Sequence, residues 1–543
     1  MFSYRRLCRW RISLMGDGRS LRWSSRFSTR AIHVCLLLCL PIILGLSLTP
    51  VLAAGTLPKY IDEYTVPTPN SAPLAITADK NGIIWFTESN VTKLGRFDPA
   101  SDSFEEYAVP GIGDMWGITV DSSGNIWVTQ YAGKGSVNPG GAIVPGGHGR
   151  LLRLNPATGN FTIVDIPTVG SFPFRVITDE QGRVWFTEIL GNKIGVYDPA
   201  LNRLEEYDVP SYFSGPADLT FDSRGSLWFT ETYNQSVAQF QPATNSFVEY
   251  HLSTSDPSRF ISSPVGIAVA QNGNVWFADH GGNWIVEFNP MSRALTRYPT
   301  GAMTAYSYSI AIPNGLLIDG HGRVWFSEHW GNRIGYLDPS TQTMVEFPIP
   351  TGPISTAFWI ALSPNGDVWF TEWGTNKIGV LHTSLLVPFS IGLSKDHSQL
   401  AAGHETSFSI SGKTTQEIGG NGTFRYAWSS YEPSELQVAF TPQPYPSFTS
   451  LAETPSEAQI KVSGRVSPGN YTLSIGIDAG WVLVSRMVQV EVTQAEPVSI
   501  LRGADTALLL AGVLAFVVGG LLLRKRLGSP TKARKGSQAA VVR

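Results

Sequence analysis

A short pattern of apolar and polar positions recurs along the middle of the chain. Each copy begins with tryptophan, continues with a second apolar residue and a small residue, and ends with an acid or, once, glutamine. The copies begin at Trp85, Trp127, Trp185, Trp228, Trp276, Trp325 and Trp369. They are 42 to 58 residues apart. A period of roughly 40 to 50 residues with strand-like content is typical of a β-propeller with one blade per repeat.

The first repeat unit, residues 73–110, shows what one blade contains. Four of its segments have the β-branched, aromatic or alternating composition of strands. A turn at residues 79–82 ends in glycine and separates the first two segments. We therefore expect four short antiparallel strands in each unit, named A to D from the central channel outward.

The two ends of the repeat array predict how the ring closes. A segment typical of strand D, residues 64–67, precedes the first strand A, and no such segment follows the last unit, which ends near Leu381. We expect the N-terminal segment to supply the outermost strand of the last blade, because this removes an exposed sheet edge. The predicted fold is all-β, with a seven-bladed propeller over residues 58–385.

A second domain is predicted over residues 388–496, where the repeat stops. Short alternating segments are separated there by turns such as 419–422 and 467–470. About seven short strands in roughly 100 residues are typical of an immunoglobulin-like (Ig-like) β-sandwich. We interpret this domain as a stalk that holds the propeller away from a membrane.

The two ends of the chain predict export and anchoring. Residues 1–54 combine a basic segment with an apolar run and small residues, which indicates a signal peptide or a retained signal anchor. Residues 505–523 carry no charge after Asp505 and are followed by a basic tail at 524–543, as in a transmembrane helix with its tail in the cytoplasm. We expect a single-pass cell-membrane protein whose bulk is extracytoplasmic. Five Asn-x-Ser/Thr sequons agree with export, at Asn90, Asn160, Asn234, Asn421 and Asn470.

Composition excludes two classes of function. The formal net charge of −3 gives no electrostatic basis for nucleic-acid binding. The three cysteines, Cys8, Cys35 and Cys39, all precede residue 40, so the exported part can form neither a disulfide nor a thiolate metal site.

The acid that ends each repeat motif is the first candidate site. Strands A and B are antiparallel, so the start of A and the end of B lie at the same mouth of the channel. The residues there are Glu88, Gln130, Glu188, Glu231, Asp279, Glu328 and Glu372. Clustered carboxylates suit Mg²⁺ or Ca²⁺, and we select Asp279, Glu328 and Glu372 as candidate metal ligands. The alternative is structural, because a lysine or arginine follows four of these acids by five residues.

Two further groups of residues are predicted at the same mouth. His280 and His329 directly follow acids in adjacent blades, and a histidine near a carboxylate can act as a general base. The other group is a candidate ligand-binding surface of aromatic residues with one opposed charge pair. Its members are Trp116, Phe174, Arg175, Asp218, Phe358 and Trp359. A plain salt bridge between blades is the alternative for Arg175 and Asp218.

Segments 73–77, 84–88, 106–110 and 191–195 together form a unit that resembles the virginiamycin B lyase (streptogramin lyase) family. The resemblance covers about residues 58–381. It implies a seven-bladed propeller, a Mg²⁺ ion and the opening of a cyclic depsipeptide ester by elimination. In such chemistry a base removes the Cα proton and a cation stabilises the enolate-like charge.

The catalytic histidines of that family follow the proline that opens a repeat. In this chain the position holds Leu74, Trp116, Phe174, Ala217, Val265, Asn314 or Phe358. None is histidine, so the family's base does not carry over, and His280 and His329 stand at a different blade position.

The sequence supports two main functions. The first is a binding or scaffold module that holds an extracellular small molecule, peptide, glycan or cation at the channel mouth. The second is a Mg²⁺-dependent C–O lyase or lactone-type hydrolase that acts outside the cell. A purely structural envelope protein is a third possibility.

Overall fold

The computed structural model describes most of the chain between residues 58 and 494. The described ranges are 58–132, 136–137, 143–144, 147–252, 263–300, 311–352, 355–414, 424–429, 436–441, 447–448, 456–462 and 467–494. The predicted signal or anchor segment, transmembrane helix and cytoplasmic tail lie outside them. No helix in the described ranges has the length and apolar character needed to span a bilayer.

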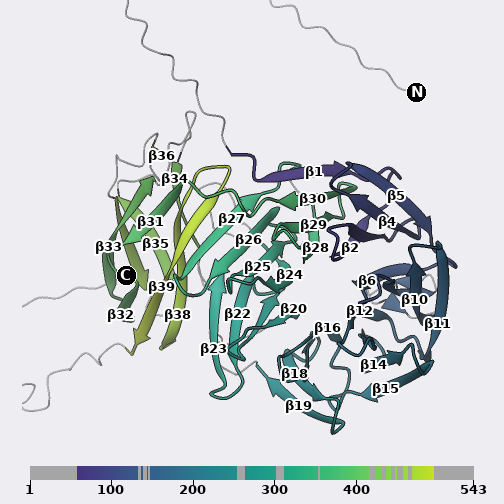
Figure 1. Ribbon diagram of the computed structural model, residues 1–543. Helices are drawn as coiled ribbons and strands as arrows, with labels where there is room; N and C mark the ends of the chain where they lie inside the picture. Colours follow the sequence, from purple (N-terminus) through teal and green to yellow (C-terminus); the bar gives the residue numbers. More distant parts are fainter. Residues whose placement is uncertain are drawn as a thin grey trace, which may run out of the picture. The chain divides into compact units, whose positions relative to one another are not determined.

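Strands of the repeat units radiate from a common centre (Figure 1). Six of the described repeat units form separate four-stranded antiparallel sheets. Their strands are β2 (Pro73–Ala78), β3 (Ile84–Glu88), β4 (Lys93–Asp98) and β5 (Ser103–Ala108); β6 (Asp114–Val120), β7 (Ile126–Ala132), β10 (His148–Asn155) and β11 (Asn160–Val169); β12 (Pro173–Thr178), β13 (Val184–Glu188), β14 (Lys193–Asp198) and β15 (Arg203–Asp208); β16 (Pro216–Phe221), β17 (Leu227–Glu231), β18 (Ser236–Gln241) and β19 (Ser246–His251); β20 (Pro264–Val269), β21 (Val275–Asp279), β22 (Trp284–Asn289) and β23 (Ala294–Pro299); β28 (Ala357–Leu362), β29 (Val368–Glu372), β30 (Lys377–Leu381) and β1 (Ile61–Thr65). A two-stranded hairpin, β8 (Ser136–Val137) and β9 (Ile143–Val144), interrupts the second unit.

One repeat unit is continuous with the C-terminal region. Its strands are β24 (Pro313–Ile318), β25 (Val324–Glu328), β26 (Arg333–Asp338) and β27 (Thr343–Pro348). β27 pairs with β39 (Leu483–Thr493), and the sheet continues through β38 (Gly469–Asp478), β34 (Phe424–Ser429) and β36 (Ser447–Phe448), with β32 (His397–Ala401) on β39. The unit therefore belongs to a nine-stranded sheet. Seven separate blades are not confirmed, because the described repeat units form six separate four-stranded sheets and this shared one.

The ring closes as the sequence predicts. The N-terminal strand β1 pairs antiparallel with β30, so that Tyr64 lies opposite Ile378 in the last sheet. The inner strands β2, β6, β12, β16, β20, β24 and β28 contact one another in this order, and β28 also contacts β2. The first and last units are therefore held together by strand pairing and by contact around the channel.

A second sheet accompanies the nine-stranded one in the C-terminal region. It consists of β31 (Phe389–Leu393), β33 (Glu405–Thr414), β37 (Ser456–Val462) and β35 (Leu436–Thr441). Buried side chains of both sheets, such as Ile410 and Ile475, belong to one hydrophobic cluster, which also includes Phe347 of β27. The Ig-like character of this region stays a prediction.

The repeated sequence motifs have local physical causes. In the turn after β2, Gly82 has a φ of 82°, and its backbone N–H donates to the Asp79 carbonyl. Glycine suits this position because it adopts positive φ without steric cost. In β4, a Cβ added to Gly95 would lie 2.0 Å from the Phe86 ring. Only glycine lets the phenylalanine of strand B pack across strand C.

Near the start of each inner strand, its pairing with strand B is interrupted by a β-bulge, which shifts the register. In β12 the register shifts between Pro173 and Val176, and in β28 between Ala357 and Ile360. Such a bulge lets neighbouring residues leave the strict alternation of a strand. The bulged residues include both Phe174 and Arg175, and both Phe358 and Trp359. The fold thus places adjacent residues of one strand together at the channel.

Candidate functional site

In several units the residue before strand A has a left-handed backbone conformation. Its carbonyl accepts a hydrogen bond from the backbone N–H of the residue after strand B. Phe172, Ile312 and Thr356 have φ values of 47°, 49° and 61° directly before their inner strands. The Ile312 carbonyl accepts from the backbone N–H of His329 at 3.0 Å. Positive φ is unfavourable for a β-branched residue. This strained connection holds the histidine beside the start of an inner strand, at the same channel mouth.

The acids that end strand B are buried rather than open to the channel. All six, together with Gln130, are fully buried. Burial, reinforced by Glu206 of the same blade, raises the pKa of Glu188 to about 9. Burial likewise raises the pKa of Glu231 and of Glu372 to about 8. These three carboxyl groups are therefore predominantly protonated at neutral pH.

Two of the acids accept hydrogen bonds within their own repeat unit. Asp279 accepts a 2.8 Å hydrogen bond from the Ser263 backbone N–H, and Glu372 accepts one of 2.8 Å from the Thr375 hydroxyl. The described residues contain no group of three or more His, Cys, Asp or Glu side chains placed to hold a metal ion. The assignment of Asp279, Glu328 and Glu372 as metal ligands stays a prediction, and we derive no chemical step through a cation.

The predicted aromatic residues lie together at the channel. The Trp116 ring centre lies 5.2 Å from that of Phe174 and 6.3 Å from that of Phe358. Trp359 contacts both Phe174, at 6.1 Å, and Phe358, at 5.8 Å. Trp116 and Phe358 are partly exposed, whereas Trp359 is buried. Four rings from β6, β12 and β28 therefore form one continuous apolar surface.

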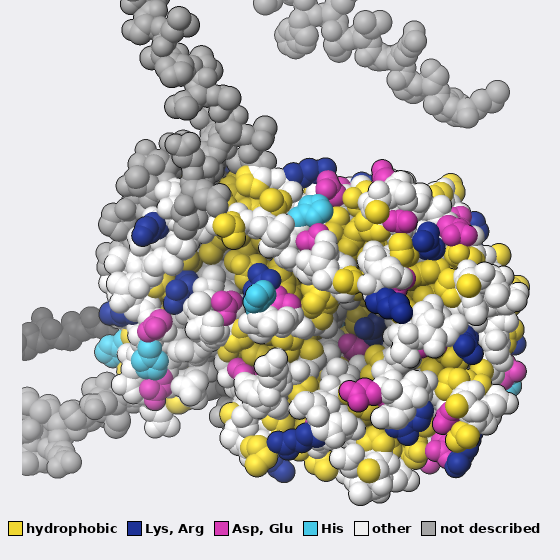
Figure 2. Space-filling model, in the orientation of Figure 1, with side chains coloured by type: hydrophobic (Ala, Val, Ile, Leu, Met, Phe, Trp, Pro, Cys, Tyr) yellow, Lys and Arg dark blue, Asp and Glu magenta, His cyan; other side chains and the backbone are white. Residues whose placement is uncertain are grey.

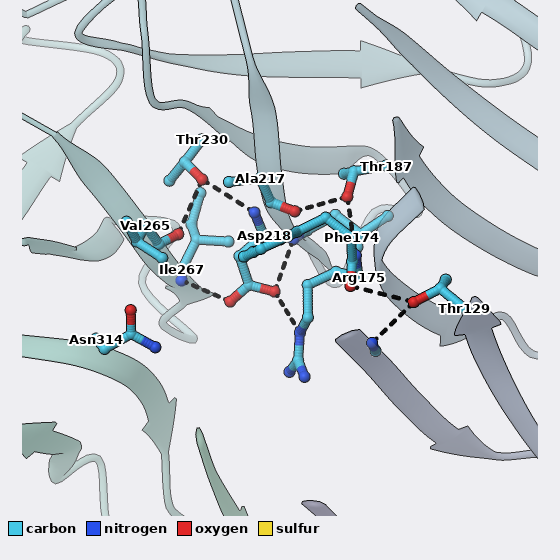
Figure 3. A network of polar contacts seen from close by, with 12 residues as sticks. Thr129, Phe174, Arg175, Thr187, Ala217, Asp218, Thr230, Val265, Ile267 and Asn314 are labelled. Carbon is cyan, nitrogen blue, oxygen red and sulfur yellow. Dashed lines mark hydrogen bonds and ion pairs between the residues drawn. The ribbon is translucent and has the colours of Figure 1, made fainter. Parts of the chain in front are cut away.

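Arg175 and Asp218 add a charge pair to this surface. The Arg175 Nε atom donates to Asp218 Oδ1 at 2.8 Å, and its guanidinium carbon lies 4.2 Å from the centre of the Trp359 ring. The Arg175 backbone is held by Thr187, whose hydroxyl accepts from the Arg175 N–H and donates to the Ala217 carbonyl of the next blade (Figure 3). Thr187 was not among the predicted site residues, although its place in the repeat motif marks it.

The two candidate histidines face each other across neighbouring blades. Their ring centres are 5.8 Å apart, and the His329 ring lies 4.9 Å from that of Phe358. Burial lowers the pKa of His280 and that of His329 to about 4. Both imidazoles are therefore neutral at neutral pH, and Phe358 connects them to the aromatic surface.

We call this set of residues the mouth cluster. Its members are Trp116, Phe174, Arg175, Asp218, His280, His329, Phe358 and Trp359. All eight were candidates from the sequence, and contacts connect all of them in the structure. The centre of the propeller is hollowed and contains charged side chains (Figure 2). Participation of the mouth cluster in binding or catalysis remains a prediction.

A separate cavity lies away from the channel mouth. It occupies about 1300 Å³ between the outer strands β19 and β23 and the C-terminal strands β38 and β39, with Trp284, Arg297 and Tyr471 in its lining. Residues 253–262, which follow the lining residue Leu252, are outside the described ranges. The sequon residue Asn470 lines this cavity, whereas none of the candidate metal-ligating, catalytic or ligand-binding residues does.

Comparison with known proteins agrees with the propeller fold. The virginiamycin B lyase family model matches residues 146–312. A streptogramin B lyase structure is 27% identical, covers 60% of this chain and 97% of its own, and has a TM-score of 0.50. No curated protein matches the chain.

Two structures of virginiamycin B lyase from Staphylococcus aureus are also similar. A selenomethionine-substituted form is 24% identical over 59% of this chain and 98% of its own, with a TM-score of 0.50. The other is a catalytically inactive histidine-to-alanine variant with quinupristin, which has the same identity, coverage and TM-score. The fold is thus a virginiamycin B lyase-like β-propeller.

Proposed function

We propose that this chain is a membrane-anchored extracytoplasmic propeller that binds a small molecule, peptide or glycan at the channel mouth. The observation that supports binding is the mouth cluster, in which partly exposed aromatic rings adjoin a charge pair and two neutral histidines. An apolar surface with a few convergent polar groups is the usual composition of a ligand site.

The mouth cluster is also held rigidly. Its residues lie on the inner strands or directly after strand B, and adjacent blades are joined by hydrogen bonds such as that from Thr187 to Ala217. Trp116 of β6 and Phe358 of β28 contact each other although 242 positions separate them in the chain. Preorganised aromatic groups bind with little loss of conformational entropy.

The proposed anchoring rests on the sequence alone. Residues 505–523 have the length and apolar composition of a membrane span, and the basic residues of 524–543 follow it. This orientation leaves the propeller outside the cytoplasm.

Ligand-observed saturation-transfer NMR on the purified full-length protein tests the binding proposal. The probes are two neutral aromatic amides, 2-naphthamide and N-acetyltryptophanamide. We expect saturable binding that is lost in the Trp116→Leu/Phe358→Leu variant. Leu201→Ala is the matched control, because Leu201 is exposed in the β14–β15 turn at the opposite mouth. Equal binding by the native protein and the Trp116→Leu/Phe358→Leu variant would contradict the proposal.

A lyase-like elimination is the second candidate, and the pair of His280 and His329 favours it. A neutral imidazole can accept a proton, and both rings are neutral here because of burial. In this scheme His329 would remove a proton from the carbon next to a carbonyl group and become an imidazolium, while the bond between the neighbouring carbon and the ester oxygen breaks and the acyl part leaves as a carboxylate.

Quinupristin is the substrate with which to test this candidate, since it accompanies the similar inactive lyase variant. Chromatography and mass spectrometry would detect a linear product of unchanged mass, as elimination requires. The activity should be lost in His329→Asn and kept in His321→Asn, where the histidine is exposed in a turn. A product heavier by one water would indicate hydrolysis instead.

A further inference from the structure

We infer that the ligand of the mouth cluster carries a carboxylate, which binds the terminal nitrogens of Arg175 while an adjoining apolar or aromatic group contacts the tryptophan and phenylalanine rings. This inference rests on the proposed function and names the chemical class of the ligand.

The first observation is the way Asp218 holds Arg175. Asp218 Oδ1 accepts from Arg175 Nε at 2.8 Å and from the Leu219 backbone N–H at 2.9 Å. Its other oxygen, Oδ2, accepts from the Ile267 backbone N–H at 3.1 Å. Asp218 is buried, and two backbone donors share its negative charge. It therefore anchors the arginine through Nε without occupying both ends of the guanidinium.

The second observation is the free edge of the guanidinium. The Arg175 Nη1 atom is buried and has no hydrogen-bond partner among the described residues. Figure 3 shows the terminal nitrogens pointing away from Asp218, on the side opposite the bonded Nε. A buried N–H group without a partner is unfavourable. A ligand oxygen at this position would remove that cost.

The third observation is the fixed plane of the guanidinium. Its carbon lies 4.2 Å from the centre of the buried Trp359 ring, and the Arg175 backbone N–H is bonded to Thr187. Arginine presents its donors as a planar fork that matches two carboxylate oxygens. Stacking and the Asp218 contact orient this fork before a ligand arrives.

The fourth observation identifies what adjoins the carboxylate. Trp359 contacts Phe174 and Phe358, and both of these rings contact Trp116. The arginine fork therefore borders an aromatic surface. The nearby histidines are neutral, because burial lowers the pKa of each to about 4, so Arg175 supplies the positive charge of the mouth cluster.

The test compares two ligands that share one ring system and differ in charge, 2-naphthoate and 2-naphthamide. Isothermal titration calorimetry on the purified full-length protein at pH 7 gives the Kd of each. We expect 2-naphthoate to bind at least about tenfold more tightly, as a charge-assisted pair of hydrogen bonds requires. In Arg175→Gln/Asp218→Asn, which removes both charges together, the two Kd values should become equal. The control Leu201→Ala should keep the native ratio.

Each outcome is decisive. Equal Kd values in the native protein, or a preference for 2-naphthoate that survives in Arg175→Gln/Asp218→Asn, would overturn the carboxylate inference and leave the proposed ligand site intact. If neither compound binds the native protein at millimolar concentration, the inference and the proposed function both fail. Should the double variant not fold, the ratio in the native protein and in Arg175→Gln alone still decides.

Discussion

The Nε2 atom of His382 lies 2.8 Å from Oδ2 of Asp62, which is 320 residues earlier in the chain. Asp62 belongs to β1, the strand that closes the ring, and His382 directly follows β30, its partner strand. The other ring nitrogen of His382 lies 3.2 Å from Asp367 Oδ2. Both nitrogens can donate at once only when the imidazole is protonated, so the ring closure contains a titratable contact.

The stability of the closure should therefore depend on pH. Burial alone would lower the pKa of His382, but the hydrogen bonds to Asp62 and Asp367 outweigh this effect and raise the pKa above its usual 6.5. This stabilisation is fully present below pH 6.5 and is lost as the pH rises through the raised pKa. His382→Gln should lower the free energy of unfolding, measured by urea denaturation, more at pH 6 than at pH 9, and the difference should be less than about 1 kcal/mol because the side chain is partly exposed. His321→Gln is the control, and an equal loss at both pH values would contradict the prediction.

Glu188→Gln should make the protein less sensitive to alkaline pH. The pKa of Glu188 is raised to about 9 by burial and Glu206. The unfolded chain ionises near pH 4.3, so stability falls as the pH rises from there to the raised folded pKa. Glutamine does not ionise, and the variant should gain several kcal/mol relative to the native protein between pH 5 and 9. Urea unfolding at these two pH values measures the difference, with exposed Glu180→Gln as control. A variant that loses stability at pH 8 would show that Glu188 is ionised and paired.

Titration with Mg²⁺ and Ca²⁺ tests the predicted metal ligands directly. We expect no saturable binding to the full-length protein at pH 7 up to millimolar concentration, because burial raises the pKa of Glu372 to about 8 and a protonated carboxyl group is a poor ligand. Calorimetry measures the binding. Saturable binding near one ion per chain, lost in Glu328→Gln or Glu372→Gln, would support the predicted metal site and contradict the expectation of no binding.

Asp319, which begins the turn between β24 and β25, should contribute more to stability than a surface acid. Asp319 Oδ2 accepts from Trp325 Nε1 at 2.8 Å and from Arg323 Nε at 2.7 Å. Asp319→Ala leaves these donors without their acceptor and should lower the free energy of unfolding by about 1–3 kcal/mol. Asp208→Ala, at an acid that is 85% exposed, should change it by less than about 0.5 kcal/mol. Chemical denaturation that gives equal losses would refute the assignment.

The propeller and the C-terminal sheets should unfold in one transition. Val345 of β27 pairs with Val484 of β39, and Met344 and Met487 share a hydrophobic cluster. Scanning calorimetry should show a single transition, and a chain ended at residue 386 should have a lower Tm because the edge of β27 is uncovered. Two well-separated transitions in the full-length protein would contradict this coupling.

The local sequence pattern was sufficient to predict much of the propeller. Strand B is predicted by the apolar motif around each tryptophan, and the closing role of residues 64–67 follows from the missing strand D after Leu381. The mouth cluster could be predicted because the order of strands in a blade places the start of A and the end of B at one mouth. Residues such as Trp116 and Phe358 then meet because the ring repeats this geometry.

Other features depended on contacts that no local pattern contains. The sequence by itself determined which positions carry acids, aromatics and histidines around the ring. Only the tertiary structure decided that the acids are buried and that Glu188, Glu231 and Glu372 are mainly protonated, because the pKa values of these three depend on burial and on a second acid in the same blade. The register shifts of the inner strands decided that Arg175 and Trp359 both reach the channel. The pairing of β27 with β39 joins residues about 140 positions apart, and alternation along either strand cannot specify its partner.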